Sequence, residues 1–336
     1  MTDQAGAAPK APDDAHLPTW ERPPFFVEGY VRSGTTLFRR MLDMHPDLYV
    51  LREMDEFQRI PKMIRKGLAD EAALKAFMEA LPNYFRNHNY DLDRFAQLAT
   101  PRLPLAASQA IFLLKSSARV AADKPGARWG HKEPHEWPFV YQLREWYPEG
   151  QFLHIVRRPH DVVASVENYR DIGLHSVRTT PVISAWHWRT SYRSVCAQGE
   201  TLGQARYLFL RYEDLVDDPR DVLGKVVDFL GVSPDGVPRM MEFHQQPLPS
   251  HQGAHMSRVR EPVTKEAKGR GERSLSEAVR RDIDWICRKE ISALNYAPLG
   301  SESVGPLRKL TLGAMCLVYD AMWAGIRASR RARGQL

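Results

Sequence analysis

The sequence predicts an α/β protein with three layers, in which a central parallel sheet of about five strands lies between two layers of helices. Short apolar runs alternate with longer segments of helical periodicity, an order typical of parallel sheets covered on both faces. The first apolar run ends in a glycine-containing turn that leads directly into a helical pattern. Of the 336 residues, 43% are hydrophobic, which is enough for a substantial core.

Three of the expected strands lie in the first half of the chain. Residues 24–31 (PFFVEGYV) form an apolar run that predicts a buried strand, and residues 35–45 carry apolar side chains at helical spacing. Residues 48–51 (LYVL) and 128–132 (RWGHK) predict two more short strands. The chain therefore begins with a strand, a glycine loop and a helix.

The second half repeats this strand-loop-helix order. Residues 151–156 (QFLHIV) predict a strand, and a helical segment follows Pro159. A helix over residues 182–198 leads to a strand over residues 206–212. In residues 218–232, Pro219 near the start and Gly231 near the end bracket an amphipathic helix. Ligands of such a sheet bind at the carboxyl ends of its strands.

The chain is expected to consist of one large domain with two extensions. Residues 1–22 are small, polar and proline-rich, without the pattern of a signal peptide, so we expect a disordered leader. Residues 23–300 form the predicted domain, in which residues 244–273 are expected to be a long loop. Residues 301–336 are expected to form a basic amphipathic helix or tail.

Most of the formal net charge of +6 lies at the carboxyl end. Residues 307–336 contain six basic residues and one acidic residue, so the rest of the chain is nearly neutral. A neutral body argues against a nucleic-acid partner, because such partners require many cationic contacts. Two interpretations of the tail stay open: a helix packed on the body, or an interfacial helix that contacts anionic lipid at the inner face of a membrane.

The cysteines and histidines do not predict a disulfide framework or a metal site. The three cysteines are far apart and form no C-x-x-C pair, which favours a reducing, cytoplasmic location. His131 and His135 are separated by a proline, and His251 and His255 by a glycine. Each pair has the four-residue spacing of metal ligands on a helix, but Pro134 and Gly253 oppose the helix that would bring the two rings together, so we expect no bound metal.

Residues 29–36 (GYVRSGTT) nearly match a nucleotide-binding P-loop, because Gly29 and Gly34 have the G-x-x-x-x-G spacing. The fold is therefore expected to be P-loop NTPase-like. The lysine that should follow is absent, and no acidic residue at a second strand end offers to hold Mg²⁺. The bound phosphate is therefore expected to belong to a compound other than a triphosphate.

Side chains of this loop add to its affinity for anions. Backbone N–H groups around Gly34, with the positive end of the next helix, suit a phosphate. Ser33, Thr35 and Thr36 add hydroxyl donors, and Arg32 adds a fixed positive charge that can hold two oxygens at once.

Two segments resemble the phosphate-binding elements of sulfotransferases that use 3'-phosphoadenosine-5'-phosphosulfate (PAPS). Residues 29–47 (GYVRSGTTLFRRMLDMHPD) resemble their 5'-phosphosulfate loop, especially in tyrosylprotein sulfotransferases and related bacterial enzymes. Residues 152–165 (FLHIVRRPHDVVAS) resemble their 3'-phosphate segment. The resemblance implies that Arg157, at a strand end, and Ser165, on the next helix, hold the 3'-phosphate.

Weaker matches extend this resemblance over residues 25–230. The segment WGHKEP resembles one that places a lysine near the transferred group, here Lys132, and RYEDLVDDP resembles one whose tyrosine contacts the nucleotide, here Tyr212. The family also places a basic loop over the cofactor. Residues 265–274 (KEAKGRGERS), called the covering loop below, have suitable chemistry, and Lys268 and Arg270 are its candidate ligands.

Three residues are candidates for catalytic roles. Negative charge grows on the departing nucleotide phosphate during transfer, so the cations of Arg32 and Lys132 would stabilise the transition state. The acceptor hydroxyl needs a general base. The resemblance to tyrosylprotein sulfotransferases places this base at Glu53. The neighbouring Asp55 and Glu56, and also His131, remain alternatives.

Several of these residues also have plain structural interpretations. Arg157 could pair with Asp161 on the helix surface, which would leave Arg158 as the phosphate ligand. Tyr212 could pack its ring into the core. Trp186 and Trp188 have helical spacing that favours core packing.

The resemblance implies transfer of a sulfuryl group from PAPS to a hydroxyl of a small molecule, lipid or glycoside. Two alternatives are a P-loop kinase or hydrolase, and a non-catalytic protein that binds nucleotides or membranes. Helical insertions at residues 55–80 and 92–121, and the segment 170–190, are expected to shape the acceptor site. A protein tyrosine is the less expected acceptor, because the family branch that modifies secreted proteins has an amino-terminal membrane anchor that we do not find here.

Overall fold

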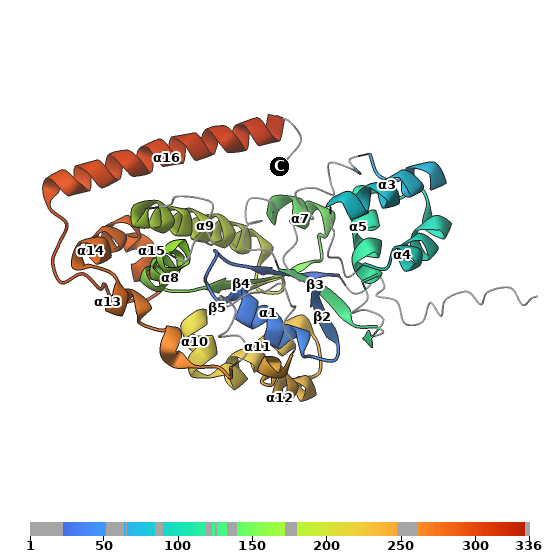
Figure 1. Cartoon of the computed structure of the whole chain (residues 1–336), viewed down its shortest axis with the longest axis horizontal. Coiled ribbons are helices and arrows are strands. Elements are labelled where there is room, and N and C mark those ends of the chain that lie inside the picture. Colours follow the sequence, from blue (N-terminus) through green and yellow to red (C-terminus); the bar gives the residue numbers. More distant parts are fainter. Residues whose placement is uncertain are drawn as a thin grey trace, which may run out of the picture.

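A five-stranded parallel sheet forms the centre of the protein (Figure 1). The computed structural model describes residues 23–51, 64, 66–84, 90–118, 123–124, 126–132, 140–171, 180–246 and 261–332. The strands are β1 (Phe25–Glu28), β2 (Leu48–Leu51), β3 (Arg128–Lys132), β4 (Gln151–Val156) and β5 (Tyr207–Arg211), in the sheet order β2-β3-β1-β4-β5. All five lie where an apolar run predicts a strand, which confirms the α/β class and the strand number.

Helices occupy both faces of this sheet. In chain order they are α1 (Thr35–Asp43), α3 (Glu71–Tyr84), α4 (Leu92–Ala99), α5 (Ala107–Ser116), α7 (Val140–Trp146), α8 (Pro159–Asp171), α9 (Pro181–Leu202), α10 (Tyr212–Asp217), α11 (Pro219–Leu230), α12 (Val237–Met240), α13 (Arg270–Ser274), α14 (Glu277–Ile286), α15 (Arg288–Ala293) and α16 (Pro306–Ala332). The described residues also contain four 3₁₀ turns between these helices: Thr100–Arg102, Pro234–Gly236, Phe243–Gln245 and Lys265–Ala267.

The central strand β1 is the point at which the strand order of the sheet reverses direction, and such a point is a common ligand-binding position. Val27 of β1 pairs with Lys132 of β3 on one side and with Leu153 of β4 on the other. The chain therefore moves to opposite sides of β1 to form β3 and β4. Parallel sheets bind ligands at such a switch point, beyond the carboxyl ends of the strands.

Alternating side chains of each strand divide the core into two layers. Phe25 and Val27 face α1, α11 and α12, where a buried cluster also includes Ile155. Phe26 points to the other face and packs with Phe152 at a ring distance of 5.0 Å. Burial of each such side chain contributes about 2 kcal/mol, so the two-residue period holds the register of the sheet.

The first helical insertion differs from the prediction over residues 66–70. The sequence pattern predicts a helical insertion over residues 55–80; within that range residues 55–63 and 65 lie outside the described part, and α3 begins at Glu71. Before it, Leu68 forms an antiparallel bridge with Leu105, and Gly67 turns the chain with a φ of 77°. A side chain at Gly67 would lie 2.2 Å from the Leu105 carbonyl, so this bridge needs glycine and prevents helix there.

Two further elements were incompletely predicted. Tyr212 was expected to end a strand, but it begins α10. The segment 244–273 was expected to be a loop, whereas its described end contains a 3₁₀ turn and the start of α13. Helices α14 and α15 follow in a region that resembles no family motif, and they pack against α8 and α9 (Figure 1).

The last helix, α16, lies across the outside of the molecule (Figure 1). One side of it packs on the body through Leu312 and Cys316, and Asp320 accepts a hydrogen bond from Trp186 Nε1 at 2.8 Å. The packed-helix interpretation is confirmed for this side. Among the described residues, no helix combines the length and apolar character needed to cross a membrane.

Candidate active site

The loop between β1 and α1 has the backbone geometry of an anion-binding turn. Gly34, immediately before α1, has a φ of 94°, and Arg32 has a φ of 67°. At Gly29 an added Cβ would lie 2.5 Å from the Ile155 carbonyl oxygen, so the loop lies directly against β4. No acidic side chain occupies the first turn of α1, so its N–H groups point to a region suited to a phosphate.

The structure brings the two predicted phosphate elements together. Arg32 Nε donates to Ser165 Oγ at 3.1 Å, and Arg157 Nη1 donates to the Arg32 carbonyl at 3.2 Å. Arg32 is more than 120 positions away in sequence from both Arg157, which follows β4, and Ser165 of α8. Their convergence creates a cationic region at the carboxyl end of β4, next to the glycine loop.

Lys132 approaches the same loop from β3. Its Nζ donates to Thr36 Oγ1 at 3.2 Å, and only 1% of the residue is exposed. Thr36 is the second residue of α1, so the ammonium group lies at the first turn of the helix. The loop thus has one cation at its helix end, Lys132, and a second, Arg32, that reaches toward α8.

Comparison with known proteins places this arrangement in a family. A family model described as the sulfotransferase family matches residues 23–235. The chain belongs to this family. It is 27% identical over 290 residues to the protein-tyrosine sulfotransferase of Drosophila melanogaster, covering 83% of this chain and 52% of that protein. It is 23% identical over 235 residues to the nodulation protein NoeE of Sinorhizobium fredii, covering 63% of this chain and 51% of that protein. The chain thus spans about half the length of these curated relatives.

Solved structures agree with the fold. The sulfotransferase domain from the curacin biosynthetic pathway matches with a TM-score of 0.56 and 20% identity, covering 82% of this chain and 98% of that domain. The sulfotransferase domain from the Synechococcus PCC 7002 olefin synthase matches with a TM-score of 0.52 and 24% identity, covering 81% and 98%. The P-loop-like α/β fold of sulfotransferases is therefore established for this chain.

In this sulfotransferase-family protein, the ring of Tyr212 packs against the glycine loop at Gly34. The residue is 6% exposed, and a Cβ added at Gly34 would lie 2.3 Å from the tyrosine ring. The Arg157 guanidinium lies 4.7 Å from the centre of the same ring, a cation–π contact. The ring is therefore packed in the interior, which is one of the two interpretations that the sequence left open. Contact of Tyr212 with the nucleotide stays a prediction.

The side chains of Arg157 and Arg158 point in different directions, and the assignment of the 3'-phosphate to Arg157 stays a prediction. Arg158 Nη1 donates to the Ala297 carbonyl at 2.7 Å, and its guanidinium lies 4.9 Å from the centre of the Tyr296 ring. Arg157 instead points to the glycine loop. Trp188, which the sequence assigned to core packing, also donates its Nε1–H to the Arg157 carbonyl at 3.0 Å, a contact that no local pattern predicts.

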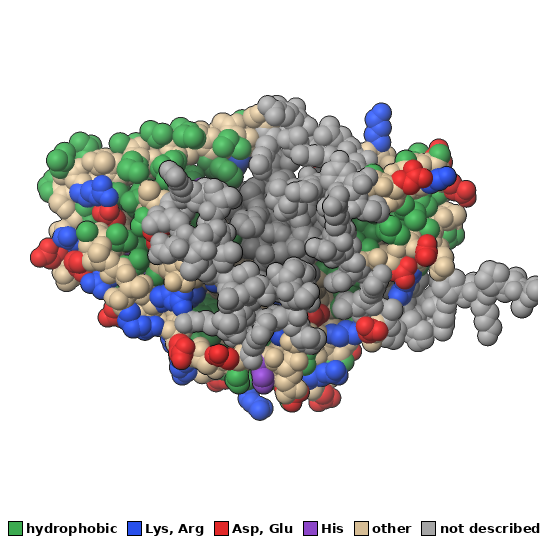
Figure 2. All heavy atoms as spheres, viewed as in Figure 1, with side chains coloured by type: hydrophobic (Ala, Val, Ile, Leu, Met, Phe, Trp, Pro, Cys, Tyr) green, Lys and Arg blue, Asp and Glu red, His purple; other side chains and the backbone are tan. Residues whose placement is uncertain are grey.

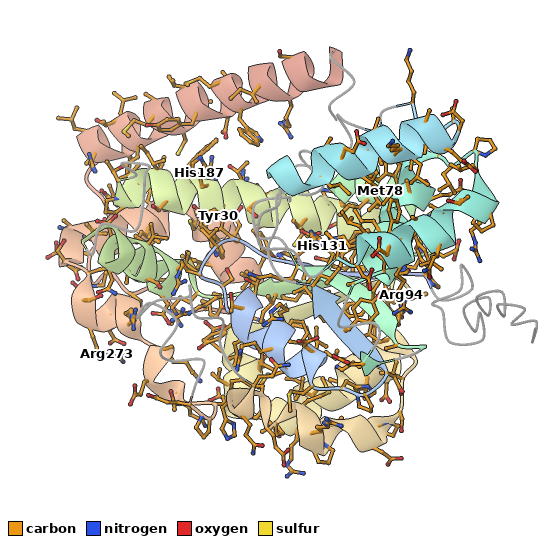
Figure 3. All side chains as sticks on the ribbon, turned by 45° about the vertical axis from the view of Figure 1, so that its right-hand side comes forward. Tyr30, Met78, Arg94, His131, His187 and Arg273 are labelled. Atoms are coloured by element: carbon orange, nitrogen blue, oxygen red, sulfur yellow. The ribbon has the colours of Figure 1, made fainter. Side chains whose placement is uncertain are left out.

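His131 is poorly placed to act as the general base. It precedes Lys132 on β3, so the two side chains point to opposite faces of the sheet. Its Nδ1 lies 3.2 Å from Lys115 Nζ, and only 2% of the residue is exposed (Figure 3). Burial and the Lys115 ammonium group lower the pKa of the His131 imidazole well below its ordinary value. A neutral, enclosed imidazole next to an ammonium group has little capacity to take up a proton.

The preferred base, Glu53, lies outside the described residues, as do Asp55 and Glu56. The nearest described residue is Leu51, which pairs with His131 at the carboxyl edge of the sheet. The chain therefore leaves β2 beside the strand that carries Lys132. The histidines at 135, 251 and 255 are also outside the described part. Within that part, no group of three His, Cys, Asp or Glu side chains has metal-site geometry.

The covering loop lies against the predicted 3'-phosphate residues. Arg157 donates to the Ala267 carbonyl, and Asp161 accepts hydrogen bonds from the Gly269 and Gly271 N–H groups at 3.0 and 2.7 Å. Lys268, a candidate ligand, forms an ion pair with Asp217.

Lys265 of the covering loop also forms an ion pair with Asp217. Hydrogen bonds from Lys268 and Lys265 lower the pKa of the Asp217 carboxyl. Arg270, the second candidate ligand, is half-buried at the start of α13. The structure thus brings the loop to the site, and the contact of Lys268 and Arg270 with cofactor stays a prediction.

Proposed function

We propose that this protein transfers a sulfuryl group from PAPS to a hydroxyl group of a small molecule, lipid or glycoside. The observation that carries this proposal is the convergence of Arg32, Ser165 and Arg157 at one end of the glycine loop, with Lys132 at the other. Two anion-binding positions on one loop suit a compound with phosphate groups at the 5' and 3' positions of an adenosine ribose. Membership of the sulfotransferase family supports the choice of PAPS. The nucleotide product would be 3'-phosphoadenosine-5'-phosphate (PAP).

Each described residue has a physical role in this proposal. PAPS supplies an activated sulfuryl group on its 5'-phosphate. The N–H groups around Gly34 and the hydroxyls of Ser33, Thr35 and Thr36 would bind that phosphate. Lys132 would stabilise the charge that grows on the departing phosphate oxygen, a type of contribution typically worth 10²–10³-fold in rate. Arg32, which here donates to Ser165, would share this role by turning from α8 toward the 5'-phosphate.

The second set of residues would hold the other end of the cofactor. Arg157 and Ser165 would bind the ribose 3'-phosphate, with Lys268 and Arg270 reaching it from the covering loop. Glu53 is the proposed general base for the acceptor hydroxyl, because the chain leaves β2 on the Lys132 side of the sheet. The absence of the P-loop lysine argues against the kinase alternative.

The test is transfer of ³⁵S-labelled sulfate from PAPS to a panel of phenols, lipids and glycosides. Labelled product from the wild-type protein, at least 10²-fold less from Lys132→Ala, and no dependence on Mg²⁺ are expected. Mg²⁺-dependent ATP hydrolysis without any sulfate transfer would instead support a kinase or hydrolase. Binding of PAP without turnover on any acceptor would support the non-catalytic alternative.

We also propose that the protein is cytoplasmic and contacts anionic lipid through the outer side of α16. All the large hydrophobic side chains that are exposed in the described part lie on this helix: Leu307, Leu310, Leu317, Val318, Met322 and Ile326. Figure 2 shows them as a band of hydrophobic surface along one edge of the molecule. The helix ends in a basic segment that includes Arg327, Arg330 and Arg331. An apolar face beside basic side chains suits the interface of an anionic bilayer.

Vesicle flotation tests this contact. Binding to vesicles with 30% phosphatidylglycerol, little binding to neutral vesicles, and an affinity about tenfold lower for Leu317→Ser are expected. Arg327→Gln should weaken binding more than Lys225→Gln, which removes the same charge from α11. Concentration-dependent dimers that Leu317→Ser disrupts, without vesicle binding, would assign this face to a second copy of the chain.

A further inference from the structure

Asp161, in the first turn of α8, joins the two halves of the predicted 3'-phosphate site. Its side chain is 1% exposed. One carboxylate oxygen accepts from the Gly271 N–H at 2.7 Å and the other from the Gly269 N–H at 3.0 Å. The second oxygen also lies 3.8 Å from Arg157 Nη2. A single buried carboxylate thus contacts both the covering loop and the arginine that follows β4.

The covering loop has the shape that this contact needs. Gly269 has a φ of 70°, in the left-handed region that favours glycine. At Gly271 an added Cβ would lie 2.5 Å from His160 Cβ, so the loop backbone packs directly on the start of α8. In the sequence Lys268-Gly269-Arg270-Gly271, the glycine N–H groups face Asp161 and the two cations alternate with them.

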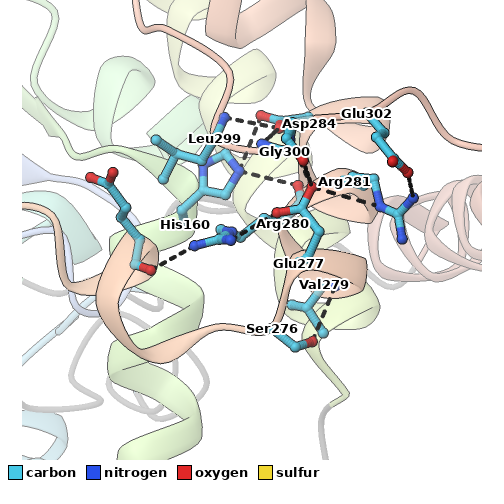
Figure 4. A network of polar contacts seen from close by, with 12 residues as sticks. His160, Ser276, Glu277, Val279, Arg280, Arg281, Asp284, Leu299, Gly300 and Glu302 are labelled. Carbon is cyan, nitrogen blue, oxygen red and sulfur yellow. Dashed lines mark hydrogen bonds and ion pairs between the residues drawn. The ribbon is translucent and has the colours of Figure 1, made fainter.

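A polar network holds the residue beside Asp161 in place (Figure 4). His160 Nε2 lies 3.1 Å from Asp284 Oδ1, and Asp284 Oδ2 accepts from the Leu299 and Gly300 N–H groups at 3.0 and 2.7 Å. Arg280 Nη1 donates to the Glu272 carbonyl at 2.7 Å, which ties α14 to α13. These contacts fix the start of α8 against α14. Asp161 then connects the start of α8 to the covering loop.

We infer that Asp161 is a positioning residue, which seats the covering loop over the ribose 3'-phosphate and so sets the preference for a 3'-phosphorylated nucleotide. This inference rests on the proposed use of PAPS. Asp161 does not touch the cofactor itself. It acts through Arg157 and through the loop that carries Lys268 and Arg270.

The sign of the effect distinguishes positioning from simple electrostatics. A carboxylate beside a phosphate site repels the phosphate, so its removal by charge alone should strengthen nucleotide binding. A carboxylate that accepts two N–H groups cannot be replaced by an amide without loss, because the NH₂ group of asparagine would face one of the donors. Asp161→Asn therefore weakens binding only if the residue positions the loop.

Calorimetry of the full chain with PAP and with 5'-AMP, which lacks the 3'-phosphate, tests this inference. For Asp161→Asn we expect the Kd of PAP to rise about tenfold and that of 5'-AMP to change less than twofold. With PAPS as substrate, KM should rise more than kcat falls. Faster amide hydrogen exchange over the covering loop should accompany these changes. Asp43→Asn, which alters a partly buried carboxylate at the far end of α1, is the matched control and should keep the wild-type ratio of the two Kd values.

Other outcomes separate this inference from the proposed function. Tighter PAP binding by Asp161→Asn, an unchanged ratio, or equal loss for both nucleotides would overturn the inference alone. Failure of the wild-type protein to prefer PAP over 5'-AMP would overturn the proposed function. If Asp161→Asn does not fold, Gly269→Ala serves instead, because it retains the N–H group and disturbs only the loop conformation; the same loss of PAP preference is expected, and a wild-type ratio would contradict the inference.

Discussion

The two predicted phosphate positions are built in different ways. The β1–α1 loop depends on backbone shape: Gly34 has a positive φ, and its Cα lies against the Tyr212 ring. The β4–α8 region depends on side chains, since Arg157 and Asp161 are held by contacts with the covering loop more than 100 residues away. The first is a local structure on one short segment, and the second exists only in the folded chain.

This difference indicates how each position can fail. A change in the loop that blocks its backbone should damage both stability and binding, because the loop is packed between β4 and α10. A change in the side chains of the β4–α8 region should affect recognition of the ribose phosphate more than stability, because it alters side-chain hydrogen bonds and leaves the backbone of β4 and α8 in place. Four variants test this division, in order of decreasing expected effect.

Lys132→Met should have the largest effect, which is on the rate of sulfuryl transfer. We expect kcat for sulfuryl transfer to fall 10²–10³-fold, because a buried cation beside the departing phosphate is lost. The affinity for PAP, measured by calorimetry, should change far less. Lys225→Met on exposed α11 is the control and should keep wild-type kcat; a wild-type rate for Lys132→Met would remove this residue from the mechanism.

Gly34→Ala should destabilise the protein by roughly 3 kcal/mol, since it adds left-handed backbone strain to a 2.3 Å clash with Tyr212. Urea unfolding measures this loss. Gly231→Ala is the matched control: its φ is 67°, and nothing lies within 4 Å of an added Cβ. Equal losses in the two variants would show that the contact with Tyr212 has no energetic importance.

Arg157→Ala should raise the Kd of PAP about 30-fold, roughly 2 kcal/mol, with a small change for 5'-AMP. Its neighbour Arg158, whose guanidinium faces Tyr296, provides the control variant Arg158→Ala. The idea of a separate ribose-phosphate position fails if both nucleotides lose affinity equally.

An effect of about the same size as that of Arg157→Ala is expected on the pH dependence of stability, through His154 of β4, which pairs in register with Glu28 before the glycine loop. Burial lowers the pKa of His154 to about 3. The unfolded chain binds a proton near pH 6.5 and the folded chain does not, so stability falls as pH decreases below about 6.5. The loss between pH 7 and 5 should be about 2 kcal/mol. His154→Gln should flatten this slope in urea unfolding; an unchanged slope would show that other groups cause it.

Local patterns were sufficient for the strands and for the glycine loop. The strand at residues 48–51 and the turn at Gly34 are each determined by a few adjacent residues, through apolar periodicity and the conformational freedom of glycine. The helical start of Tyr212 was not predicted, because a residue at the end of an apolar run has no local signal that separates the two states. Helices α14 and α15 were also not predicted, because their packing on α8 and α9 involves distant segments.

By itself, the sequence determined the α/β class, the five strands and the position of the glycine loop, because these depend on patterns within a few adjacent residues. Only the tertiary structure decided that Arg157 and not Arg158 faces the loop, that His131 lies against Lys115, and that Asp161 holds the covering loop. Each of these depends on which distant groups meet in space. Hydrogen bonds and ion pairs of that kind leave no periodicity in the chain from which they could be inferred.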